Sequence, residues 1–193
     1  MGYRRHVALC VLAAASIASA QQATFTTANA VSFTVSTERD AYNSQEQISL
    51  RYEIKNVSER PLYVPRHQGE ISCPPNSGPQ SVMHVDAWFE NAAGKKFHSG
   101  WLGACIDRGE RRTLSQRMSE AAVLLRPGEH LDGTIALQGN IFRLAPGDYQ
   151  IDAVLYGWKE DEFSEQELRE LSTMGAPFLR GETPASVPII ITH

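Results

Sequence analysis

The sequence predicts an all-β protein built as an antiparallel β-sandwich. Three observations predict it: apolar and polar residues alternate with a period of two in several segments, Gly- and Pro-containing turns separate these segments, and a single stretch has a helical pattern. Such alternation is typical of a strand with one buried face, and many short strands divided by turns are typical of a sandwich. One sandwich domain is therefore expected over residues 31–193.

The first twenty residues are predicted to be a secretory signal peptide. Arg4 and Arg5 precede an apolar run over residues 7–17, and the small residues Ala18-Ser19-Ala20 follow it. This order is that of an exported protein. The run is shorter than the roughly 20 residues needed to span a bilayer. We therefore expect export to the periplasm or the exterior, no membrane insertion after cleavage, and a flexible polar leader over residues 21–30.

Charge and cysteine count narrow the class of protein further. Removal of Arg4 and Arg5 leaves 16 basic against 22 acidic residues, a net charge of −6. An acidic domain lacks the positive surface of a nucleic-acid binder, so no nucleic-acid partner is expected. After the signal, Cys73 and Cys105 remain, and two cysteines in an oxidising compartment predict one disulfide. The alternative, a metal or redox pair, has no C-x-x-C motif or histidine spacing in its favour.

Alternation also places the strands of the N-terminal half. The apolar positions that share a strand face are, in chain order, Val31, Phe33 and Val35, then Ile48, Leu50, Tyr52 and Ile54, then Met83, Val85, Ala87 and Phe89. A short strand over residues 62–64 is expected to end at Pro65, since proline cannot donate to a sheet ladder. Asn91-Ala92-Ala93-Gly94 has the composition of a hairpin turn before residues 95–98. Residues 66–81 and 100–116 are predicted to be loops.

Two Pro-Gly turns frame the C-terminal strands. Arg126-Pro127-Gly128-Glu129 and Ala145-Pro146-Gly147-Asp148 each place Pro and Gly at the central positions that a type II turn prefers. Alternation predicts strands over residues 131–137 and 149–155, each following one of these turns, and a last strand over 187–192.

One helix is predicted in the connection before the last strand. Ser164 and Glu167 form a capping box, and Phe163 and Leu168 are placed to form a hydrophobic staple. The whole connection, residues 158–185, is far longer than a hairpin requires. Because a long ordered insertion costs conformational entropy and a short turn would close the hairpin, this insertion is expected to serve recognition.

A set of turn motifs carries a resemblance to a known family. The motifs are Lys55-Asn56-Val57-Ser58 at a strand end, Trp88 and Gly94 in the next hairpin, the turn over residues 125–129, and Leu144-Ala145-Pro146-Gly147-Asp148-Tyr149. In this order they resemble the bacterial immunoglobulin-like domains grouped with the intracellular proteinase inhibitor of Bacillus. The resemblance covers residues 46–157 and implies an immunoglobulin-like sandwich, with Tyr149 placed like a tyrosine corner.

The same resemblance makes proteinase inhibition a candidate activity. Its motifs are structural turns, and this chain departs from the family by its export signal, its cysteine pair and its insertion. No residue role is therefore carried over. A disulfide-tied loop over residues 69–79 is the segment that would enter a protease cleft, because a preorganised loop loses little entropy on binding.

No catalytic, metal or cofactor site is predicted. A G-x-S-x-G nucleophile motif does not occur in the sequence. His84 and Asp86 share a strand face that His98 could join, but a metal site needs three or four converging ligands, so a polar solvent-facing surface is the preferred interpretation. The carboxylates over residues 160–170 are interpreted as a solvated face at a helix start.

Aromatic side chains provide the predicted binding site. Trp158, Phe163 and Phe178 lie in the insertion, and Trp101 lies beside Cys105. Recognition by a rigid sandwich is usually concentrated in its end loops, with aromatic residues as anchors. The predicted function is non-catalytic recognition of an unidentified protein partner, a class that includes proteases. The alternatives are proteinase inhibition, and a carbohydrate-binding module or enzyme in which Trp101 and Trp158 line a groove.

Overall fold

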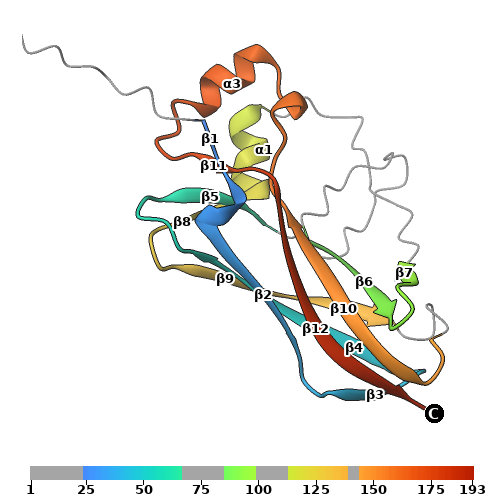
Figure 1. The fold of residues 1–193 in the computed structure, drawn as a ribbon. Helices are drawn as coiled ribbons and strands as arrows, with labels where there is room; N and C mark the ends of the chain where they lie inside the picture. Colours follow the sequence, from blue (N-terminus) through green and yellow to red (C-terminus); the bar gives the residue numbers. More distant parts are fainter. Residues whose placement is uncertain (1–23, 67–84, 99–112, 139–143) are drawn as a thin grey trace, which may run out of the picture.

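A computed structural model describes residues 24–66, 85–98, 113–138 and 144–193. The protein is an all-β, immunoglobulin-like sandwich, as the sequence predicts. Its larger sheet has the strand order β3-β12-β10-β6-β7, and the facing sheet has the order β2-β4-β9. A third sheet of four short strands, β1-β11-β5-β8, lies at one end of the sandwich, together with helices α1 and α3 (Figure 1).

The elements follow one another in a simple order along the chain. Those of the N-terminal half are β1 (Phe25–Thr26), the short 3₁₀ helix η1 (Ala28–Ala30), β2 (Val31–Thr37), β3 (Ala41–Asn43), β4 (Gln47–Asn56), β5 (Leu62–Pro65), β6 (Val85–Asn91) and β7 (Lys96–His98). Those of the C-terminal half are α1 (Leu114–Ala121), β8 (Ala122–Leu125), β9 (His130–Gln138), β10 (Gly147–Tyr156), η2 (Glu160–Glu162), α3 (Glu165–Leu171), β11 (Phe178–Leu179) and β12 (Glu182–Thr192).

The sandwich core is formed by the positions that alternation predicts. Ile48, Leu50 and Ile54 of β4 are fully buried, and they face Phe89 of β6 and Ile151 of β10 within one apolar cluster. Burial of such side chains is worth roughly 1.5–3 kcal/mol each before entropy is counted. The sandwich pairs are antiparallel except for β3, which joins β12 in parallel.

Tyr149 and the first Pro-Gly turn have the predicted local structure. The Tyr149 hydroxyl donates to the Ala145 carbonyl over 2.9 Å, which is the hydrogen bond of a tyrosine corner. Gly128 has φ +80°, as the third residue of a type II turn requires. The prediction for the second turn is wrong, because Gly147 has φ 153° and is the first residue of β10.

The largest differences from the sequence prediction lie at the end of the sandwich that carries the helices. Helix α1 occupies part of a segment predicted to be a loop, and the leader predicted to be flexible is ordered from Phe25, because β1 pairs in parallel with β11. The last strand begins at Glu182 rather than Val187, since Tyr156 and Glu182 are partners in the β10–β12 ladder. The insertion is therefore residues 157–181.

The signal peptide predicted over residues 1–20 lies outside the described residues, as do Cys73, Cys105 and Trp101. The predicted disulfide and the proposed inhibitory loop over residues 69–79 therefore stay predictions. Among the described residues, none of the helices is both long enough and apolar enough to span a membrane.

Candidate functional site

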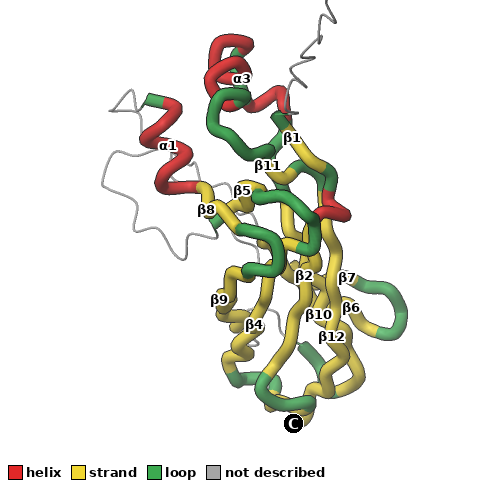
Figure 2. The backbone as a smooth tube through the Cα atoms, turned by 90° about the vertical axis from the view of Figure 1, so that its left-hand side faces the viewer, coloured by secondary structure: helices red, strands yellow, loops and turns green. Residues whose placement is uncertain are grey.

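The insertion and helix α1 together form a structure that we call the end cap, defined as residues 113–121 and 157–181. Figure 2 shows its two helices above the same end of the sandwich. Each helix begins with a reciprocal capping box: Thr113 with Gln116 in α1, and Ser164 with Glu167 in α3. Both boxes satisfy backbone N–H groups that would otherwise lack a partner at the helix start. The second box is confirmed where the sequence predicted it.

The end cap has an apolar cluster of its own, separate from the sandwich core. Its buried members are Leu114, Met118, Trp158, Phe163, Leu171 and Phe178. Phe178 is the centre of this cluster. Its ring stacks on Tyr63 of β5 at a centroid distance of 4.7 Å and meets Trp158 edge-on at 5.3 Å. Phe25 of β1 packs within 6.4 Å of Phe178 and 6.2 Å of Phe163.

This cluster changes the interpretation of the predicted binding residues. Trp158 is 3% exposed, Phe163 9% and Phe178 0%, so their rings hold the end cap together and are not presented to a partner. Leu168 packs against the cluster that contains Phe163, an arrangement that fits the predicted hydrophobic staple. Burial of Trp158 also removes that side chain from the groove that a carbohydrate-binding module would need.

The base of the insertion requires a close approach of two backbones. Gly157 donates its N–H to the Gly181 carbonyl over 2.8 Å, and Trp158 donates to the Leu179 carbonyl over 2.9 Å. A Cβ atom at Gly157 would lie 2.6 Å from the Leu179 carbonyl oxygen. A side chain at this position would therefore force the two ends of the insertion apart.

The outer surface of the end cap is acidic and exposed. Glu160, Asp161 and Glu162 form η2, and Glu165 begins α3. Arg180 pairs with Glu160 over 2.6 Å at the exposed surface. The Glu167 carboxylate accepts a hydrogen bond from the Ser164 N–H over 2.8 Å, so this residue serves the helix start. The arrangement fits the predicted solvated face at a helix start.

A cleft of about 310 Å³ lies where β1 meets the connection between β4 and β5. Its apolar lining comes from Phe25, Pro61, Leu62 and Pro177, and its polar lining from Thr26, Ser58, Glu59 and Arg60. Neither Glu59 nor Arg60 forms an ion pair with another described residue. The volume is at the lower limit for a small-molecule pocket. A cleft of this size suits a single inserted side chain.

Asn56 fixes the shape of the cleft wall. It is fully buried at the end of β4, and its side-chain N–H₂ donates to the carbonyls of Arg60 at 2.8 Å and Leu125 at 2.9 Å. Its side-chain oxygen accepts from the N–H and hydroxyl of Ser58. Every side-chain polar atom of Asn56 is therefore paired, and the loop from Ser58 to Pro61 is held against β8. Sequence reasoning treated this residue only as part of a turn motif.

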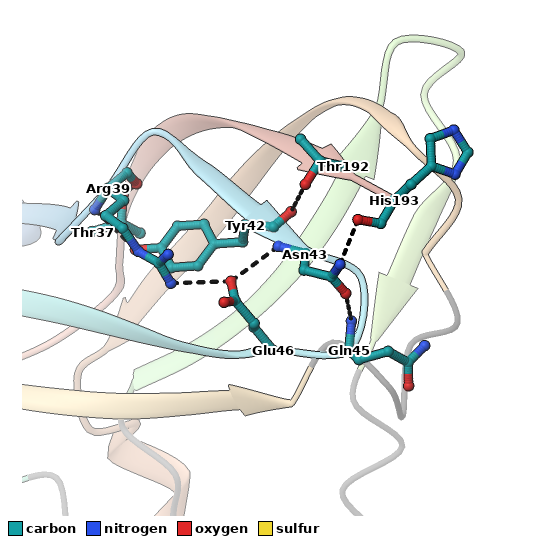
Figure 3. A network of polar contacts seen from close by, with 8 residues as sticks. All are labelled: Thr37, Arg39, Tyr42, Asn43, Gln45, Glu46, Thr192 and His193. Atoms are coloured by element: carbon teal, nitrogen blue, oxygen red, sulfur yellow. Dashed lines mark hydrogen bonds and ion pairs between the residues drawn. The ribbon is translucent and has the colours of Figure 1, made fainter.

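A second polar network, drawn in Figure 3, lies around β3 at the end of the molecule opposite the helices (Figure 1). The Glu46 carboxylate accepts hydrogen bonds from the Arg39 guanidinium and from the Asn43 N–H, both at 3.0 Å. The Asn43 hydrogen bond, opposed by desolvation and assisted by the Arg39 charge, lowers the pKa of Glu46. Asn43 donates in turn to the carbonyl of His193. The network ties the β3 turn to the end of β12, which is a structural role.

Comparison with known proteins assigns no family. No family model matches the sequence, and no curated protein matches it. Solved structures with a similar chain path include a β-glucosidase from Erythrobacter marinus, at 14% identity and a TM-score of 0.38, and a β-glucosidase from Listeria innocua in complex with glucose, at 11% and 0.36. Each match covers 84% of this chain but 16% of the enzyme, so the chain spans about one sixth of their length.

A smaller protein gives a match of similar quality. The CARDB domain of a Pyrococcus furiosus protein, solved in complex with di-metal ions, is 12% identical with a TM-score of 0.35. The match covers 84% of this chain and 87% of that domain. The class of the protein is given by its own sheets and by the Tyr149 corner: it is an immunoglobulin-like sandwich with a helical insertion.

Proposed function

We propose that this protein is an exported, non-catalytic recognition domain that binds a protein partner at the end of the sandwich that carries the end cap. The observation that carries the proposal is the cleft between β1 and the β4–β5 connection, which combines apolar lining residues with two exposed charged residues, Glu59 and Arg60. Protein interfaces commonly combine such an anchor pocket with a polar, solvent-accessible rim.

The contact surface proposed here differs from the one expected from sequence. The insertion contributes Pro177 to the cleft, whereas its aromatic rings serve as the internal support. Rigid support favours binding, because side chains that are already ordered lose less entropy when a partner arrives. Export is proposed from the N-terminal sequence pattern alone.

Site-specific photo-crosslinking in the expressing cell tests the proposal. Pro61 is exposed on the cleft rim, and Ala93 is exposed in the β6–β7 turn. A benzophenone amino acid at position 61 is expected to capture one discrete envelope or secreted protein, and the same group at position 93 is expected to capture none. Equal patterns from both positions would contradict recognition at the cleft.

Two substitutions refine the result. Pro61→Arg would fill the cleft mouth with a charged chain, while Ala93→Arg adds the same charge elsewhere. The first is expected to weaken binding of the captured partner at least about tenfold, the cost of losing one anchor contact of roughly 1.4 kcal/mol or more, and the second to leave it unchanged. If the captured protein is a protease and its activity falls on binding, proteinase inhibition becomes the specific form of the function.

A further inference from the structure

The solvent-facing side of the β4–β9 pair brings three possible metal ligands together. Glu53 of β4 and Asp132 of β9 are direct partners in the antiparallel ladder, and His130 precedes Asp132 by two residues on the same strand face. The imidazole Nε2 of His130 lies 3.3 Å from the Asp132 Oδ2. One ligand atom from each of the three residues lies within 4.8 Å of the other two.

This arrangement places like charges directly opposite each other. Facing carboxylates on an antiparallel pair destabilise a sheet. His130 can offset them only when it is protonated, and Lys55, which faces His130 across the ladder, forms no ion pair with another described residue. A bound cation would remove the repulsion between Glu53 and Asp132.

The ligand spacing fits a small divalent transition metal. Zn²⁺ binds imidazole nitrogen and carboxylate oxygen at about 2.0–2.2 Å, so ligand atoms around a tetrahedral ion are about 3.3–3.6 Å apart. The His130–Asp132 pair already has this separation. The Glu53 carboxylate has an oxygen within 4.8 Å of the ligand atoms of His130 and Asp132, so it is the third ligand. Ca²⁺ is disfavoured, because it takes six to eight oxygen ligands and no imidazole.

We propose that Glu53, His130 and Asp132 bind one Zn²⁺ ion on the outer face of the sheet, with water completing the coordination. Three protein ligands and an open position are sufficient for a tetrahedral zinc site. His130 and Asp132 are about half exposed or more, with side-chain exposures of 53% and 66%, so the ion can enter without rearrangement of the fold. The proposal is independent of the partner-binding function proposed above.

The experiment is a titration of the purified, untagged protein with zinc chloride, followed by calorimetry and by the imidazole resonances of His130. One ion per chain is expected, with shifts confined to the β4–β9 face. Glu53→Gln, His130→Ala and Asp132→Asn are each expected to weaken binding about tenfold or more, as loss of one of three ligands requires. Thr134→Ala, on the same strand face, is the matched control and is expected to leave binding unchanged.

The thermal midpoint provides a second measurement that separates a metal site from a simple ion pair. Excess Zn²⁺ is expected to raise the midpoint of the wild-type protein and of Thr134→Ala, and not that of the three ligand variants, because a ligand that binds only the folded state stabilises it. The proposal is overturned if zinc does not bind at millimolar concentration. It is equally overturned if zinc binds with the same affinity to all three variants.

Discussion

The sandwich core and the end-cap cluster are built from different kinds of sequence. The sandwich core takes mainly every second residue from long strands, and most of its members are aliphatic. The end-cap cluster takes one or two residues from each of several short segments, and aromatic rings fill its centre. A long strand therefore specifies its own buried face, whereas a cluster assembled from scattered residues depends on the folding of its surroundings.

The largest expected effect is on the sandwich core. Phe89 is fully buried between the sheets, so Phe89→Ala is expected to lower the free energy of unfolding by about 3–5 kcal/mol. Because β6 pairs with β10 and β7, the loss should affect the whole domain in one transition. Chemical denaturation followed by circular dichroism measures it. A loss below 1 kcal/mol would mean that the core is less tightly packed around this ring.

Phe178→Ala tests whether the end cap unfolds separately. Removal of this fully buried ring is expected to lower the free energy of opening of the end cap by about 3–5 kcal/mol, as for Phe89→Ala. The β10–β12 ladder does not depend on this ring and is expected to stay closed. Hydrogen exchange is therefore expected to accelerate at the amides of Tyr63 and Trp158 and not at those of Ile151 and Ile189. Equal acceleration at all four amides would show that the two clusters unfold as one unit.

Asn56 joins the end of β4 to β8, and its loss is expected to have an intermediate effect on stability. Asn56→Ala leaves the Leu125 carbonyl without its buried hydrogen bond and releases the loop at Ser58, at a cost of about 2–3 kcal/mol. Ser58→Ala removes a partner at the loop and should cost less than half as much. Thermal unfolding of both variants gives the comparison. If both variants lose the same stability, the stabilisation comes from the loop at Ser58 and not from the hydrogen bond between Asn56 and the Leu125 carbonyl.

The two capping boxes allow a smaller and more local test. Thr113→Ala and Ser164→Ala each remove the hydroxyl that accepts from the third helical N–H, at an expected cost of about 1 kcal/mol. The effect should appear as faster exchange within α1 or α3 respectively. Thr113→Ser and Ser164→Thr keep an acceptor and serve as controls that should show little change.

The smallest expected effect on stability comes from Glu46, at the end of the sandwich opposite the end cap, and it depends on pH. The folded pKa of Glu46 is lowered from its ordinary value of 4.5, so its contribution to stability is present above 4.5 and is lost as the pH falls through the lowered folded value. Glu46→Gln is therefore expected to lose less thermal stability than the wild type between pH 6 and pH 2. A larger loss in the variant would contradict the hydrogen-bonding role of the carboxylate.

The sequence predicts the strands of the sandwich well and the structure of the end cap only in part. Alternation located β2, β4, β6, β9 and β10, and the capping box at Ser164 located α3, because these signals lie within one segment. Helix α1 has the same type of signal, Thr113 with Gln116, but this signal lies within residues 100–116, which were predicted to be a loop. The pairing of Phe25 with the insertion could not be predicted, because a two-residue parallel strand has no periodicity of its own.

The candidate sites were harder to predict for a related reason. Trp158, Phe163 and Phe178 were recognised as aromatic residues of the insertion, but sequence alone does not say whether a ring points inward or outward. The cleft at Pro61 and the Glu53–Asp132 pair each join residues from separate elements. Their proximity is set by strand register, which no local pattern encodes.

The position of the C-terminal residue bears on how this protein should be handled in binding assays. Residue 193 follows β12 at the end of the molecule opposite the end cap (Figure 1). Eleven residues of extended strand span about 36 Å. Immobilisation through the C-terminal residue would thus hold the cleft and the end cap away from a sensor surface, while a linker joined just before β1 would emerge beside Phe25 and obstruct the same cleft.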